Sequence, residues 1–234
     1  MRRGTVCIVE GLIGAGKSSF TTELTDSVPG SLALMEPDET DNGNPYLGSF
    51  YEDMGRWAFT MQIHLLQARF RMHQNAQWMA MSGQGPIILD RSYFGDTAFA
   101  RLQLLQGTMT PNEYETYRSI YSAMTASVLL PNICIHLKVS PEVAAERIDK
   151  RASERTGRVC EKVIELGYLQ QLDSEINQMV DTLGSQGVKV VEVPYDLDRP
   201  DKSSRKPIIE KITAEIRNIS APDIFESHRR SIAP

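Results

Sequence analysis

A run of eight residues, Gly11-Leu-Ile-Gly-Ala-Gly-Lys17-Ser18, could bind phosphate. It fits the pattern G-x-x-x-x-G-K-S/T at every fixed position, with the apolar run 6–9 before it and residues 19–24, which can open a helix, after it. Strand, glycine loop and helix in that order turn backbone N–H groups and the positive end of the helix toward an anion. We therefore expect a nucleoside triphosphate site, with Mg²⁺ held by the Ser18 hydroxyl. The residues expected at the triphosphate are Gly11, Gly14, Ala15, Gly16, Lys17, Ser18 and Ser19.

Charged side chains follow two of the expected strands. Glu36 comes directly after the run 31–35, and Asp90-Arg91 ends the run 86–90. The carboxyl ends of strands in an open α/β sheet face the ligand crevice, so Glu36 could take a proton from a hydroxyl group of a phosphate acceptor. Asp90 could hold the metal directly or through water, and Arg91 could brace the acceptor oxygen or a phosphate. A solvent-facing Glu36 at a strand end is the alternative.

Polar residues that could read a nucleobase lie on or just before the long periodic segment 54–82. Gln62 and Arg69 are seven residues apart, so they share one face of a helix, and Tyr51 precedes it. The competing interpretation is that the side chains of Tyr51, Gln62 and Arg69 lie on the protein surface.

The basic segment 151–158 breaks the apolar pattern. It is either a solvated loop between helices or an arginine-bearing flap that closes over a phosphoryl group.

Hydrophobic periodicity predicts an α/β fold with a five-stranded parallel sheet and helices on both faces. We expect a single domain over 1–221 with a lid at 151–160, followed by a polar C-terminal tail at 222–234. The expected strands are 4–10, 31–35, 86–90, 132–138 and 187–193. The expected helices are 18–27, 54–82, two between 92 and 128, one beginning at Pro141, one at 161–184 and one at 203–219.

Composition excludes several classes of protein. The 25 basic and 30 acidic residues give a net charge of −5, which offers no general attraction for a nucleic acid polymer. No apolar stretch approaches ~18 residues, so we expect no membrane span, and the loop at Gly11 leaves no room for a cleavable leader. Three widely separated cysteines, Cys7, Cys134 and Cys160, favour a reducing, cytoplasmic location.

The chain resembles the deoxynucleoside kinases, and most of all the bacterial-type deoxyadenosine/deoxyguanosine kinases, over roughly residues 4–200. Asp41 stands where the animal enzymes carry a tryptophan, which favours the bacterial-type group. The resemblance implies a P-loop kinase fold and a homodimer formed through helices of the region 54–128. The motifs that carry it are Gly11–Ser18, Glu36-Pro37, Asn44-Pro45-Tyr46-Leu47, Phe50-Tyr51-Glu52-Asp53, Arg56-Trp57-Ala58-Phe59 with Gln62, Arg69-Phe70, Asp90-Arg91-Ser92, Ser140-Pro141-Glu142 and Gly167-Tyr168-Leu169.

The same resemblance implies a role for each matching residue. Glu36 would take the 5′-hydroxyl proton while Arg91 steadies that end of the sugar. Tyr51 and Glu161 would hold the 3′-hydroxyl, and Gln62 would bond the base. Arg69 and Asp96 match a pair around the exocyclic base groups, whereas Phe99, the candidate for base stacking, lies one place before the family's aromatic position. Lys17, Ser18 and Asp90 would serve phosphate and Mg²⁺. Arg147, Arg151, Arg155 and Arg158 are candidate lid arginines, and Tyr195 and Asp196 would lie over the adenine of ATP.

These observations predict ATP- and Mg²⁺-dependent phosphorylation of the 5′-hydroxyl of a deoxynucleoside in salvage, with a purine substrate and deoxycytidine as a further candidate. A thymidylate-kinase-like enzyme is the alternative, but such enzymes need a further basic residue to grip a monophosphate, and Met35 precedes Glu36 here. A nucleotide-binding switch is the second alternative. Switch GTPases read guanine through N-K-x-D, and the chain contains no such run.

Overall fold

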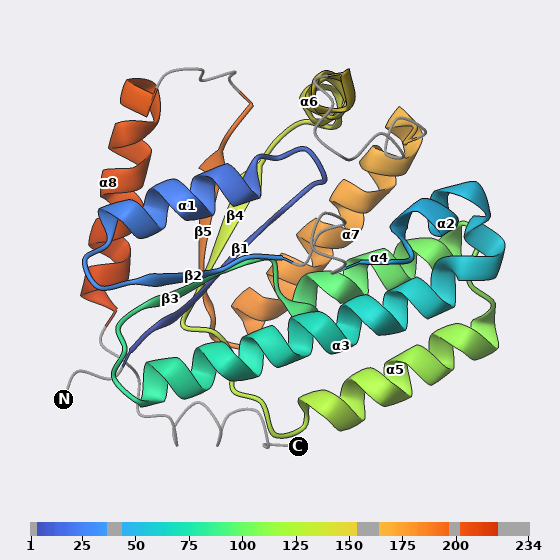
Figure 1. Cartoon of the computed structure of the whole chain (residues 1–234), viewed down its shortest axis with the longest axis horizontal. Coiled ribbons are helices and arrows are strands. Elements are labelled where there is room, and N and C mark those ends of the chain that lie inside the picture. The colour runs from blue at the N-terminus through green and yellow to red at the C-terminus, as the bar shows by residue number, and fades with distance from the viewer. Residues whose placement is uncertain (1–3, 37–43, 154–163, 197–201, 220–234) are drawn as a thin grey trace.

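The computed structural model describes residues 4–36, 44–153, 164–196 and 202–219, and these form a parallel five-stranded sheet (Figure 1). The strand order is β2-β3-β1-β4-β5, and every neighbouring pair is parallel. The expected fold class is therefore confirmed. The strands are β1 (Val6–Gly11), β2 (Leu32–Leu34), β3 (Ile87–Asp90), β4 (Ile133–Lys138) and β5 (Lys189–Pro194).

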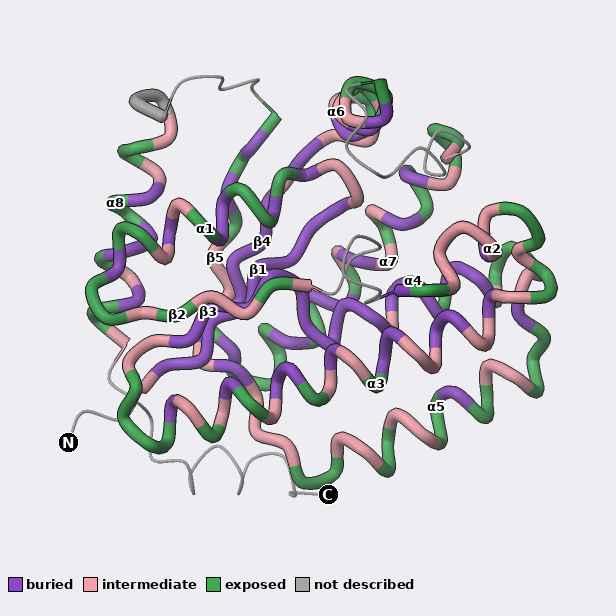
Figure 2. The backbone as a smooth tube through the Cα atoms, viewed as in Figure 1, coloured by how far each residue is buried: buried purple, intermediate pink, exposed green. Residues whose placement is uncertain are grey.

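Burial follows from the position of each strand in the sheet. β1 lies in the middle and is buried along its whole length, as expected for an apolar run covered on both faces. β3 and β4, its neighbours, are almost as fully buried, whereas the edge strand β2 is partly exposed (Figure 2). Cys7 and Cys134 are buried in β1 and β4.

Helices cover both faces of the sheet (Figure 1). α1 and α8 pack together on one face, while α3, α4 and α7 cover the other, with α5 packed outside α3 and α6 against α7. The helices are α1 (Lys17–Ser27), α2 (Leu47–Glu52), α3 (Met54–Met81), α4 (Tyr93–Leu105), α5 (Pro111–Thr125), α6 (Pro141–Ser153), α7 (Leu166–Ser185) and α8 (Lys202–Asn218).

Local capping explains several helix starts. The Asp53 side chain accepts a hydrogen bond from the backbone of Arg56 at the start of α3, and Ser92 caps α4. α5 begins with a capping box between Thr110 and Glu113. These caps place the starts of α3 and α4 next to the ends of α2 and β3, where the candidate site residues lie.

Two sequence predictions about helices need correction. The short helix α2 was not predicted; Phe50 is buried there in a small apolar cluster with Ala58, Met61 and Leu65. α7 was expected from residue 161, but Glu165 has extended backbone angles and the helix starts after it. Arg151 to Ser153 form the end of α6, and the rest of the expected lid, the tail 222–234 and Cys160 lie outside the described residues. No helix in the described ranges is long and apolar enough to cross a membrane.

Candidate functional site

The phosphate-binding loop connects β1 to α1. Gly14 and Gly16 have φ angles of 80° and 87°, and a Cβ atom at Gly14 would come within 2.6 Å of the Ala144 carbonyl oxygen, so both backbone conformation and space require glycine at that position. Because α1 begins at Lys17, its N-terminal N–H groups face the loop. The loop therefore has the geometry of an anion site.

Lys17 is the cation of this loop. Its Nζ donates to the carbonyl oxygens of Leu12, at 2.8 Å, and Gly11, at 3.3 Å. Burial, together with the nearby Arg91, lowers the pKa of Lys17 to about 7 despite the opposing effect of three carboxylates. A triphosphate would supply the negative charge that this ammonium group needs.

Asp90 ends β3 beside the loop. The Ser18 hydroxyl donates to Asp90 Oδ2 at 2.5 Å, which joins the two candidate Mg²⁺ ligands. Asp90 Oδ1 is buried and, within the described ranges, has no hydrogen-bond partner. Burial and the nearby Glu36 raise the pKa of Asp90, while Lys17 and Ser18 oppose the shift. A buried carboxylate oxygen without a donor is a fitting ligand for a divalent cation.

Glu36 lies between two arginines rather than in solvent. Arg69 donates two hydrogen bonds to Glu36 Oε1, one of them from Nε at 3.0 Å, and Arg91 Nε lies 3.4 Å from the same oxygen. Burial raises the pKa of Glu36, but Arg69, Arg91 and Lys17 outweigh it and hold the pKa at about 2. Its side chain is only 17% exposed, so the interpretation of Glu36 as a solvent-facing strand-end residue is wrong. The carboxylate is ionised at neutral pH.

Glu10, the last residue before the loop glycine, is a site residue that the sequence analysis missed. Its Oε1 accepts hydrogen bonds from the Ser92 backbone at 2.8 Å and from the Ser92 hydroxyl at 2.6 Å, and its Oε2 lies 3.6 Å from Arg91 Nη1. Arg91 has the left-handed φ of 66°, a conformation that costs energy for a non-glycine residue. Glu10 thus fixes the turn that aims Arg91 at Glu36. Its place at the end of the apolar strand was the available signal.

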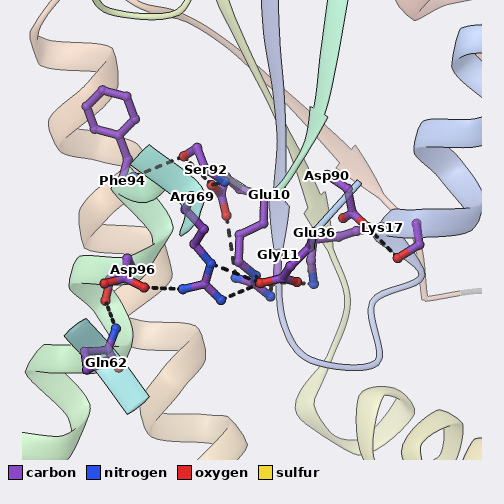
Figure 3. Close-up of polar contacts among 12 residues, drawn as sticks. Glu10, Gly11, Lys17, Glu36, Gln62, Arg69, Asp90, Ser92, Phe94 and Asp96 are labelled. Atoms are coloured by element: carbon purple, nitrogen blue, oxygen red, sulfur yellow. Dashed lines mark hydrogen bonds and ion pairs between the residues drawn. The ribbon is translucent and has the colours of Figure 1, made fainter. Parts of the chain in front are cut away.

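A second polar cluster joins α3 to α4 (Figure 3). Arg69 reaches from Glu36 to Asp96 Oδ1, and the Tyr117 hydroxyl donates to Asp96 Oδ2 at 2.8 Å. Gln62 Nε2 donates to the Asp96 carbonyl oxygen, and Gln103 Nε2 donates to Gln62 Oε1, each at 3.0 Å. Gln62 and Arg69 are 0% and 3% exposed, so the surface interpretation of these two side chains is wrong.

Most of the predicted site residues border one cavity of about 350 Å³. The Phe99 ring forms part of its wall, with the Arg91 guanidinium 4.8 Å from the ring centre. Asn44, Leu47, Phe50, Met61, Leu65 and Tyr168 also line it and had no assigned role. The predicted residues at the cavity are Gly14, Gly16, Lys17, Ser18, Ser19, Glu36, Tyr51, Gln62, Arg69, Arg91, Phe99 and Arg151.

Other predicted residues support the site from outside this cavity. Arg147 donates to the carbonyl oxygens of Ala15, Tyr195 and Asp196, and so ties the loop to the end of β5. The Asp196 carboxylate accepts from the Ser140 backbone at 2.5 Å. Gly11, Asp90 and Asp96 are not among the described residues that line the cavity, but they bond to Lys17, Ser18 and Arg69, which do. Arg155, Arg158 and Glu161 fall outside the described residues.

Comparisons with known proteins agree with this geometry. A family model described as deoxynucleoside kinase matches residues 7–217. A deoxyadenosine kinase of Dictyostelium discoideum is 33% identical over 192 residues, covering 82% of this chain and 73% of that protein. A deoxyguanosine kinase of Bacillus subtilis is 28% identical over 211 residues, covering 90% and 95%. The structure of a deoxyadenosine kinase from M. mycoides with the products dCMP and a flexible dCDP has a TM-score of 0.74 and 28% identity, covering 92% of this chain and 100% of that one.

Proposed function

The chain belongs to the deoxynucleoside kinase family, and from the geometry of its site we propose that it transfers the terminal phosphate of ATP to the 5′-hydroxyl of a purine deoxynucleoside. The observation that carries this proposal is a single cavity bordered by the phosphate loop, by the ionised Glu36 and by Gln62. The cavity can therefore hold the phosphate at the loop, the alcohol at Glu36 and the base at Gln62. Phosphoryl transfer depends mostly on such positioning and on charge stabilisation.

Glu36 is the general base in this proposal. Its carboxylate accepts a hydrogen bond from the 5′-hydroxyl. It takes the proton late, after the bond to phosphorus has begun to form and the alcohol has become acidic. A carboxylate with a pKa of about 2 is a weak base, which suits late rather than early proton removal. Arg91, held by Glu10, stabilises the charge that develops between the alcohol and the phosphate.

Ser18 and Asp90 are the proposed Mg²⁺ ligands, because Asp90 Oδ1, which has no hydrogen-bond partner among the described residues, and the Ser18 hydroxyl lie together beside the loop. Bound Mg²⁺ neutralises phosphate charge during transfer. In this proposal Tyr51 and Gln62, which line the same cavity, contact the sugar and the base respectively. The proposed role of Glu161 at the 3′-hydroxyl comes from the family resemblance alone. The proposed roles of Arg151, Arg155 and Arg158 at phosphate come from that resemblance and from the basic segment 151–158, and Arg151 lines the cavity. A homodimer and a cytoplasmic location also stay predictions.

A radiolabel transfer screen over the four deoxynucleosides and their monophosphates tests the reaction. We expect labelled product when a deoxynucleoside is the acceptor and none when a monophosphate is the acceptor, because the residue before Glu36 is the apolar Met35. Transfer to thymidine monophosphate instead would support the thymidylate-kinase-like alternative.

Replacing Glu36 by glutamine tests the role of the carboxylate. Glu36→Gln keeps the shape of the side chain and should leave nucleotide affinity intact while lowering turnover by ~10²-fold or more, the usual range for loss of a general base. Glu115→Gln is the matched control, since Glu115 lies 73% exposed on α5. Steady-state kinetics and calorimetric binding of ATP measure the two effects, and unchanged turnover of Glu36→Gln would contradict the assignment.

A further inference from the structure

The side-chain amide of Gln62 is held in one orientation by two partners. Its Nε2 donates to the main-chain carbonyl oxygen of Asp96, a group that can only accept, and its Oε1 accepts from Gln103 Nε2. Gln62 and Gln103 are 0% and 1% exposed, so water cannot take the place of either partner. A reversed amide would set Oε1 against the Asp96 carbonyl oxygen, which leaves two buried acceptors facing each other.

One N–H and one lone pair of this amide remain for a base in the cavity. Adenine offers an amino N–H next to an unprotonated ring nitrogen, whereas guanine offers a carbonyl oxygen next to a ring N–H. For a base seated in one position, these two patterns require opposite orientations of the Gln62 amide. A fixed orientation therefore serves one purine better than the other.

Arg69 indicates which side of the purine faces Asp96. Its guanidinium extends from Glu36 to Asp96 (Figure 3). In the proposed function the 5′-hydroxyl lies at Glu36 and the base lies at Gln62, so the guanidinium runs along the side of the nucleoside. In the anti conformation of a nucleoside, N7 and the group on C6 lie on the side of the base that carries the 5′-carbon. The C6 group should therefore face Arg69 and the Nε2 side of Gln62.

The groups available on that side are hydrogen-bond donors. Glu36 and Asp96 use three of the five N–H groups of Arg69, which leaves two, and Gln62 presents Nε2 there. The Asp96 carboxylate is bonded to Arg69 and Tyr117 and does not border the cavity within the described ranges. Arginine donating to O6 and N7 is the commonest specific contact with guanine, and the amino group of adenine would face donors here.

We propose that Gln103 is a positioning residue that fixes the Gln62 amide for guanine, so that the enzyme prefers deoxyguanosine to deoxyadenosine. This inference rests on the proposed function, because it assigns the base of the same substrate. Gln103 acts through Gln62 and needs no contact with the nucleoside. Neither its type nor its place on α4 marks it in the sequence.

The test compares kcat/KM for deoxyguanosine and deoxyadenosine in three proteins. In the unaltered enzyme we expect a preference for deoxyguanosine of roughly 10- to 100-fold. Gln103→Leu removes the donor to Gln62 Oε1 and should lower that ratio by roughly five- to tenfold. Gln106→Leu is the control: Gln106 is exposed at the C-cap of the same helix and bonds Gln171, away from the cavity, so the ratio should not change.

A second variant covers the case in which Gln103→Leu does not fold. Gln103→Met keeps the length of the side chain but has no N–H to donate to Gln62 Oε1, so it should lower the ratio by a similar factor. Three results would overturn the inference while leaving the proposed reaction intact. They are equal use of both purines by the unaltered enzyme, a preference for deoxyadenosine, and a ratio that neither variant changes. Failure to phosphorylate any deoxynucleoside would overturn both.

Discussion

Replacing Gly95 by alanine should disturb the site through Glu10. Gly95 lies in the first turn of α4, and a Cβ atom there would come within 2.5 Å of Glu10 Oε2 and 2.9 Å of Glu10 Oε1. A carboxylate at the end of a side chain could normally swing away. Here it is fully buried, and Ser92 holds it with hydrogen bonds of 2.8 and 2.6 Å, so the new methyl group must strain or break them.

The size of the effect follows from these bonds. A hydrogen bond to a charged group contributes about 1.5–3 kcal/mol, while alanine in a helix gains about 1 kcal/mol over glycine. Loss of both bonds should therefore lower the free energy of unfolding by a net ~2–5 kcal/mol, and each kcal/mol lowers Tm by about 2–4 °C in a chain of this size. Turnover should fall as well, because Ser92 and Glu10 hold Arg91 in its left-handed conformation.

Thermal denaturation and steady-state kinetics of two glycine variants measure this effect. Gly48→Ala is the control, since Gly48 lies in α2 and no neighbouring atom in the described part of the chain comes within 4 Å of an added Cβ, and it should keep or slightly raise Tm. Combining Gly95→Ala with Glu10→Asp shortens the carboxylate and should recover part of the lost Tm. If Gly95→Ala matches Gly48→Ala in both Tm and turnover, the reasoning about Glu10 is refuted.

Two further predictions concern titration and burial. The pKa of Lys17 is about 7 before nucleotide binds, so at pH 8 most of the free enzyme has lost the Lys17 proton. Bound phosphate restores that proton, so nucleotide binding at pH 8 should take up about 0.9 proton. Calorimetry in buffers of different ionisation enthalpy measures the uptake, and Lys17→Arg, charged throughout, should show none. Tyr117→Phe removes the donor to the buried Asp96 Oδ2 and should lower the free energy of unfolding by ~1–3 kcal/mol. Urea denaturation measures this effect, with Tyr114→Phe as the control because Tyr114 is half-buried on the same helix. Equal stability of the two variants would contradict the prediction.

Much of the fold was predictable because its signals are local. The five apolar runs became the five strands, and the periodic segment 54–82 became α3 within one residue. α2 escaped prediction because six residues are too few to show a helical period, and the buried Phe50 shows its packing only in three dimensions. The resemblance to the deoxynucleoside kinases is confirmed, and it rests on an ordered set of short motifs spread over the chain.

The candidate site was predictable only in part. Glu36, Asp90 and Arg91 could be placed from the rule that parallel strands end at one edge of a sheet. Glu10 obeys the same rule, and its place at the end of the apolar strand was the local signal, but its bonds to Ser92 leave no mark in the sequence. The roles of the predicted site residues stay predictions until the variants are measured.

The sequence by itself determined the phosphate loop, the parallel sheet and the charged residues at the strand ends, because each depends on neighbours along the chain. The tertiary structure alone decided which residues support them. Glu10 meets Ser92 across 82 positions, and Gln62 meets Asp96 and Gln103 across 34 and 41. Such contacts depend on sheet register and on the packing of α3 against α4, and a hydrogen bond between buried groups is set by that packing rather than by local sequence.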